Sequence, residues 1–126
     1  MRGQLEDAKD LVMRTAALGF ALVVMFSPAL AATILAGQAA SHIGETATVE
    51  GTATEVKVSR GGTTFVDIDG VYPSQTFTAV IFAGDTVAVG DLSGLRGKTV
   101  DITGTIRLYR GKPEIIVKSR SQIAAH

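Results

Sequence analysis

The side chains of this chain that could do chemistry are mainly basic and aromatic. The basic ones fall in two glycine-containing turns, residues 59–62 and residues 108–113. Cations pair with phosphates and aromatic rings stack on bases, so this combination suits an extended anionic ligand. The predicted ligand-binding residues are Lys57, Arg60, Phe65, Tyr72, Phe77, Tyr109, Arg110 and Lys112.

These residues also have a plainer interpretation. Phe65 and Phe77 lie within expected strands and fit a hydrophobic core, whereas basic residues at turns are commonly just solvated. Tyr109 beside Arg110 is the strongest candidate for a surface contact, because a turn exposes both side chains to a ligand.

Residues for catalysis are scarce. The chain has no cysteine and only two histidines, His42 in an expected linker and His126 at the last position. No zinc-ligand spacing and no Gly-x-Ser-x-Gly motif occurs. Asp67 and Asp69, at alternate strand positions, could bind a divalent cation, although acidic residues at a strand end are commonly solvated. We therefore expect a non-enzymatic protein with no catalytic residue, no metal site and no cofactor.

The charge distribution agrees with a local rather than a global attraction for anions. The formal net charge is zero, so no overall field draws in polyanions. From residue 107 to residue 126, however, the sequence has five basic residues and one acidic residue, Glu114. This asymmetry favours an anionic partner for the C-terminal part.

The elements that must position these residues are β-strands. Thr and Val dominate after Gly44, and both suit a pleated sheet. Glycines inside two of the segments, Gly51 and Gly104, predict bulges or sharp coils. Asp91 could cap one helical turn through residues 92–95 between the third and fourth strands. The expected strands are residues 47–58, 63–68, 76–82, 98–106 and 114–118.

This order predicts an all-β, five-stranded Greek-key barrel, with a short helix or coil between strands three and four. Residues 49–56, 72–82, 97–106 and 109–115 resemble bacterial stand-alone domains of the oligonucleotide/oligosaccharide-binding fold (OB-fold). An SH3-like barrel is the main rival, although it usually lacks the long third connection. The resemblance implies that a ligand crosses strands two and three between the turns at residues 59–62 and 108–113.

The N-terminal part predicts export. No charged residue occurs from Thr15 to Gly44, and an apolar run is followed by Pro28 and Ala29-Leu30-Ala31. This pattern is typical of a signal peptide over residues 1–31, in the form of a hydrophobic helix, with Met13 as a possible true start. Cleavage after Ala39 and an uncleaved membrane anchor are the alternatives. The expected organisation is then a linker at 32–45, an OB-fold domain at 46–120 and a tail at 121–126.

Together these features predict an exported, periplasmic or secreted binding module for single-stranded nucleic acid or another anionic polymer. The alternative is a cell-envelope module that binds a protein or a glycan, and a small enzyme or enzyme accessory domain is a weaker option. Contact with a membrane is expected only through an uncleaved N-terminal segment.

Overall fold

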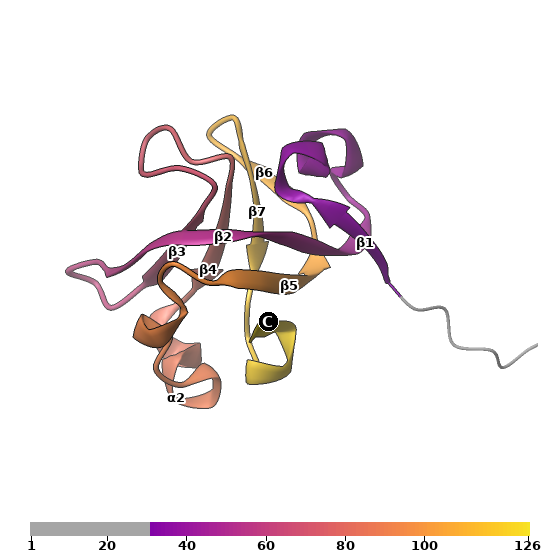
Figure 1. The fold of residues 1–126 in the computed structure, drawn as a ribbon. Coiled ribbons are helices and arrows are strands. Elements are labelled where there is room, and N and C mark those ends of the chain that lie inside the picture. The colour runs from indigo at the N-terminus through magenta and orange to yellow at the C-terminus, as the bar shows by residue number, and fades with distance from the viewer. Residues whose placement is uncertain (1–30) are drawn as a thin grey trace, which may run out of the picture. The chain divides into compact units, whose positions relative to one another are not determined.

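The computed structural model describes residues 31–126, which form one compact unit (Figure 1). The predicted signal peptide, residues 1–31, lies outside the described residues except for Ala31. The possible start at Met13 also lies outside them. The strands are β1 (Ala32–Leu35), β2 (Thr46–Val58), β3 (Thr64–Ile68), β4 (Phe77–Ile81), β5 (Thr99–Thr105), β6 (Arg107–Tyr109), β7 (Lys112–Ile116) and β8 (Ile123–Ala125).

The other elements of the described residues are short helices. They are the 3-10 helices η1 (Ala36–His42), η2 (Ala83–Asp85), η3 (Ser93–Leu95) and η4 (Arg120–Gln122), and the α-helix α2 (Thr86–Val89). The predicted helical turn is present as η3, but its N-cap residue is Leu92, and Asp91 lies one residue earlier, where its Oδ1 accepts the backbone N–H of Ser93 at 2.9 Å. This hydrogen bond lowers the pKa of Asp91, since it favours the ionised carboxylate. No helix among residues 31–126 is long and apolar enough to cross a membrane.

The long strand β2 changes partners along its length (Figure 1). Residues 46–52 pair with β5, whereas residues 53–58 pair with β3 after a register shift between Ala53 and Glu55. Gly51 lies just before this change, and a Cβ there would clash with the side chain of Ile68. Gly51 is therefore required by close approach; its φ is not in the left-handed region, and the irregularity falls beyond it, at Thr54.

The hydrogen-bonded sheet has the order β6-β7-β4-β3-β2-β5-β8, with β1 on β2, and it is not closed. β5 and β6 are separated only by Ile106. One nearly continuous segment therefore pairs with β2 through β5 and with β7 through β6. Between β5 and β7 the Gln122 amide replaces backbone pairing, donating to Thr103 O at 3.0 Å and to Ile116 O at 3.2 Å. A Cβ on Gly104 would lie 2.7 Å from Ile115 Cγ2, so this seam needs glycine.

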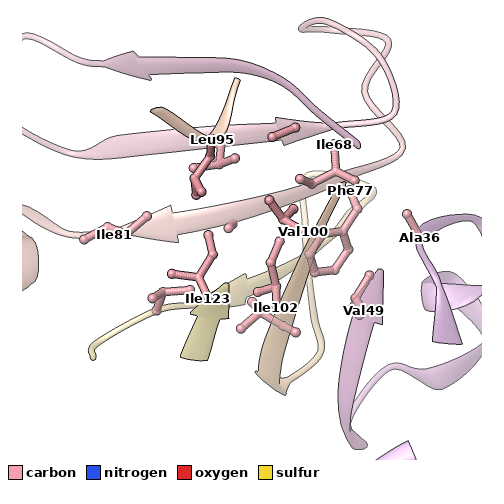
Figure 2. Packing of buried hydrophobic residues seen from close by; sticks show 14 of the residues in the cluster. Ala36, Val49, Ile68, Phe77, Ile81, Leu95, Val100, Ile102 and Ile123 are labelled. Atoms are coloured by element: carbon pink, nitrogen blue, oxygen red, sulfur yellow. The ribbon is translucent and has the colours of Figure 1, made fainter. Parts of the chain in front are cut away.

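One hydrophobic cluster fills the interior (Figure 2). Strand alternation puts Val66 and Ile68 of β3, and Phe77, Ala79 and Ile81 of β4, on the inner face. Phe77 is fully buried and points toward the interior beside Val100 and Ile102 in Figure 2. The residues between them in sequence face the opposite side, which is where the sheet is free to contact a ligand.

Two predicted boundaries are corrected by the structure. Residues 32–45 were expected to be a linker, yet β1 pairs in parallel with β2, and Ala36 and Ala39 of η1 are buried. Residues 121–126 were expected to be a tail, yet β8 pairs with β5. The reason is the same at both places: β2 and β5 would otherwise expose open edges, and a short segment without a periodic pattern suffices to cover an edge.

Candidate functional site

The outer face of β2, β3, β4 and β7 presents two rows of side chains. Lys57 of β2 pairs in register with Phe65, which pairs with Val80. In the next row, Asp67 pairs with Thr78, and Thr78 pairs with Glu114. Residues directly opposite on neighbouring strands point to the same face, so an apolar row lies beside a polar row.

The loop between β3 and β4 rises over this face and is held firmly at its base. The Thr54 hydroxyl donates to the carbonyl oxygens of Asp67 (2.9 Å) and Gly70, and the Thr76 hydroxyl donates to Asp69 O at 3.0 Å. Gly70 has φ +134°, and a Cβ would lie 2.6 Å from Ser74 O. Only glycine fits there, so the loop that carries Tyr72 and Gln75 has a defined path.

The β6–β7 hairpin rises on the same side of the domain as this loop (Figure 1). Tyr109 pairs with Lys112, and the two residues between them have positive φ, 49° at Arg110 and 78° at Gly111. Positive φ at both central positions is the conformation that suits a tight two-residue hairpin. Lys112 Nζ donates to Gln75 O at 3.0 Å, which ties the hairpin to the loop.

A pocket of ≈ 470 Å³ lies between the loop and the hairpin, over the two rows. This volume is within the range of small-ligand sites. It is lined by Lys57, Phe65, Asp67, Tyr72, Pro73, Gln75, Thr78, Val80, Tyr109, Arg110, Lys112 and Glu114.

Each tyrosine of the pocket is paired with a cation. Lys57 Nζ lies 4.5 Å from the centre of the Tyr72 ring, and Arg110 Cζ lies 5.2 Å from the centre of the Tyr109 ring. Both distances are within the range of cation–π attraction. Tyr72 and Tyr109 are 65% and 49% exposed, so flat aromatic surface remains open to a ligand beside positive charge.

Two carboxylates lie deeper in the same pocket. Asp67 is 1% exposed, and its Oδ2 lies 3.4 Å from Lys57 Nζ, an ion-pair contact that lacks hydrogen-bond geometry. Glu114 is 7% exposed and lies 3.6 Å from Arg107 Nε. Burial raises the pKa of Glu114, because it disfavours the ionised form, and the Arg107 charge partly opposes this rise.

The structure brings most of the predicted site residues together. Two predicted residues do not belong to the pocket lining: Arg60 is exposed in the turn after β2, and Phe77 is in the core. Phe77 is a correction, because strand alternation turns it inward with Ala79 and Ile81. The predicted residues that line the pocket are Lys57, Phe65, Tyr72, Tyr109, Arg110 and Lys112.

Sequence reasoning missed the polar floor of the pocket. Asp67, Thr78 and Glu114 alternate with core-facing residues of β3, β4 and β7, and that alternation was the available signal. Asp67 and Asp69 do not share a site, because Asp69 Oδ1 accepts the backbone N–H of Thr52 at 2.9 Å. Gln75, in the loop, had no periodic signal.

A second cluster of chemically capable groups lies at β8. His126 Nε2 lies 3.4 Å from Glu50 Oε2 and 3.3 Å from Asp101 Oδ1. Two carboxylates and an imidazole are a donor set that could hold a divalent cation. The three side chains are between 35% and 51% exposed, and they are also a plain surface ion-pair cluster.

Comparison with known proteins identifies the fold but no family. No protein-family model and no curated protein matches the chain. A solved structure assigned as an aspartyl-tRNA synthetase from Leishmania major Friedlin matches 82% of this chain with 12% identity and a TM-score of 0.53. An asparaginyl-tRNA synthetase from Entamoeba histolytica matches 78% with 20% identity and a TM-score of 0.48.

The chain spans about a fifth to a quarter of the length of these proteins, 22% and 24% respectively. The match therefore concerns one part of a much larger protein. Together with the strand order, it confirms the predicted class: the described residues are an all-β domain with an OB-fold.

Proposed function

We propose that residues 31–126 form a non-enzymatic module that binds single-stranded nucleic acid, or a similar extended anionic polymer, across this pocket. The observation that carries the proposal is the pair of exposed tyrosines, each beside a cation, on the rim of one pocket. The similarity of the fold to part of a structure assigned as an aspartyl-tRNA synthetase supports the same class of ligand.

The charges divide into two groups that suit such a ligand. Lys57 and Arg107 each pair with a buried carboxylate. Among residues 31–126, no carboxylate pairs with Arg110 or Lys112. Lys112 Nζ donates one hydrogen bond to Gln75 O, which is uncharged, so both cations keep their charge for phosphates. The tyrosine faces require unstacked bases, which favours single strands over duplexes.

The test is a titration of a fluorescently labelled single-stranded oligonucleotide at several salt concentrations. Each phosphate contact contributes about 0.7 to the salt slope for single strands, so Arg110 and Lys112 together should contribute about 1.4. The double variant Arg110→Ala/Lys112→Ala should lose this part of the slope. The matched control is Lys98→Ala/Lys118→Ala, which removes the same charge from exposed residues outside the pocket. Absence of binding at low salt, or equal loss in both double variants, would refute the proposal.

We keep the proposal non-enzymatic because the pocket lining has no histidine, cysteine or serine, and its two carboxylates, Asp67 and Glu114, are each paired with a cation. The same titration checks this point, since the labelled oligonucleotide should remain intact on a gel. We also propose that the protein is exported, on the apolar segment before Pro28. N-terminal sequencing of protein recovered outside the cytoplasm should find a start near Ala32, and an intact start would contradict cleavage.

A second candidate ligand is a neutral glycan of the cell envelope. Asp67 and Glu114 favour it, because carboxylates accept hydrogen bonds from hydroxyl groups and aromatic faces pack against sugar rings. Binding to a glycan array that does not weaken with salt, together with no oligonucleotide binding, would select this alternative.

A further inference from the structure

Two oxygen atoms at the floor of the pocket lack hydrogen bonds. Asp67 Oδ2 and Gln75 Oε1 are buried and have no hydrogen-bond partner among the described residues. Their residues are 1% and 6% exposed, and both line the pocket. Gln75 Oε1 has no donor, and Asp67 Oδ2 has only the ion-pair contact with Lys57. Buried acceptors that lack hydrogen bonds destabilise the fold, so two of them at one pocket point to donors supplied by a ligand.

The orientation of Gln75 is fixed by its neighbour. Its Nε2 donates to Thr78 Oγ1 at 3.3 Å, which leaves Oε1 as the free end of the amide. Thr78 in turn lies opposite Asp67 in the strand register. The two acceptors therefore lie at the same polar row of the pocket, Asp67 on β3 and Gln75 in the loop before β4, where Thr78 holds its amide.

Lys57 supplies a donor beside these acceptors. It is on β2, and its ammonium group lies 3.4 Å from Asp67 Oδ2. Because β2, β3 and β4 are consecutive in the sheet, the floor presents a donor at Lys57, then an acceptor at Asp67, then an acceptor near Gln75. This order of one donor and two acceptors is specific for a ligand edge that presents one acceptor and two donors.

On the proposed function, we infer that the pocket selects guanine from a single strand, with Lys57, Asp67 and Gln75 reading its Watson–Crick edge. That edge presents an acceptor at O6 followed by donors at N1–H and N2–H₂, the complement of the floor. The exposed faces of Tyr72 and Tyr109 are placed to stack on the base. Arg110 and Lys112, on the rim, face the adjoining phosphates.

The other bases each mismatch this pattern. Thymine and uracil present an acceptor, one donor and a second acceptor, and that second acceptor meets Gln75 Oε1. Cytosine and adenine place an unprotonated ring nitrogen against the Asp67 carboxylate. A mispaired buried acceptor costs roughly ten- to a hundredfold in affinity.

Binding requires one small movement. Asp67 Oδ2 is covered in the free protein, and the Lys57 ammonium lies over both this oxygen and the Tyr72 ring. Lysine has a flexible four-carbon chain, so its ammonium can turn toward O6 and expose the carboxylate. The backbone need not move.

The test uses an 11-nucleotide deoxythymidine strand in which the central position is dG, dA, dC or dT. Wild-type protein should bind the dG strand at least tenfold more tightly than the other three. Asp67→Asn should bring the four affinities within about threefold of one another while leaving the salt slope unchanged. Asp85→Asn, a partly exposed aspartate outside the pocket, is the matched control and should keep the dG preference.

The outcomes separate the two proposals. Equal binding of all four strands by the wild type, or preference for another base, overturns the guanine inference and leaves the proposed function standing. A dG preference that survives Asp67→Asn overturns the assignment of Asp67. No binding of any strand refutes the proposed function, and this inference with it. Circular dichroism and melting of each variant show that the comparison is between folded proteins.

Discussion

Two clusters in this domain each combine two carboxylates with basic side chains, and they differ in how deeply the carboxylates are buried. At the pocket, Asp67 and Glu114 are buried beside Lys57 and Arg107, under exposed tyrosines. At the other cluster, Glu50 and Asp101 meet His126 on β8. Asp101 Oδ1 also lacks a hydrogen bond, but its side chain is 37% exposed, whereas that of Asp67 is 2% exposed.

The difference shows how burial changes the energetic effect of a charged side chain. A half-exposed carboxylate keeps much of its hydration through its other oxygen, so its ion pair contributes little and needs no ligand. A buried carboxylate with a free oxygen has lost its hydration and gained no full replacement. On the proposed function, the pocket cluster is arranged for recognition, whereas the β8 cluster is sufficient to hold a terminal strand.

The largest expected effect concerns the glycines that support each region. Gly51 packs against Ile68 and Asp69 beneath the pocket loop, and Gly104 packs against Ile115 and Gln122 at the seam. Gly51→Val and Gly104→Val should each destabilise the fold by about 2 kcal/mol, because overpacking displaces branched core side chains. Thermal unfolding should register a fall of roughly 10 °C for each variant.

The control for these variants is Gly94→Ala, because nothing lies within 4 Å of the Cβ that it would add and its φ is not in the left-handed region. Its melting temperature should stay within a few degrees of the wild type. If Gly51→Val and Gly104→Val melt like this control, the close-packing argument is wrong for both regions.

A smaller effect distinguishes the two aspartates. Asp67→Asn should leave the free protein as stable as the wild type or about 1 kcal/mol more stable, because it removes a buried charge that is incompletely paired. Asp101→Asn should change stability by less than about 0.5 kcal/mol. Urea unfolding of both variants measures these differences. Strong destabilisation by Asp67→Asn would mean that Asp67 serves the fold rather than a ligand.

The smallest effect is the pH dependence of stability that arises from Glu114. Burial raises the pKa of Glu114 in the folded state above its ordinary value of 4.5. Its favourable contribution is then fully present below that ordinary value and is lost as pH rises through the folded-state pKa. Glu114→Gln, which cannot ionise, should therefore gain stability relative to the wild type between pH 4 and pH 7, by less than about 1 kcal/mol.

Melting temperatures of wild type and Glu114→Gln at both pH values provide the measurement. A difference between wild type and Glu114→Gln that does not vary with pH would contradict the burial argument.

Strong local patterns allowed much of the fold to be predicted. Alternating Thr and Val residues located β2 to β5 to within a residue or two, and β7 was found with its start two residues late. Asp91 does bond to the helical turn that follows it, although the N-cap residue of that turn is Leu92. Short pieces without a pattern, β1, η1 and β8, were missed, because they cover edges that other strands leave open and no periodic pattern marks them.

The candidate site was predictable in its rim but not in its floor. Turns expose their side chains, so the place of Tyr109, Arg110 and Lys112 in an expected turn was enough to predict them as surface residues. The aromatic residues of the strands were ambiguous, and only the structure separates Phe65, which lines the pocket, from Phe77, which fills the core.

The sequence by itself determined five of the strands, the main turns and the all-β class, because alternation and glycine placement act over a few residues. Only the tertiary structure decided that Lys57, Asp67, Gln75 and Lys112 meet at one pocket, and that Gln122 bridges β5 and β7. These contacts join segments far apart in the chain, and they depend on the register of whole strands. A local pattern specifies which way a side chain points, but strand pairing specifies which side chain it meets.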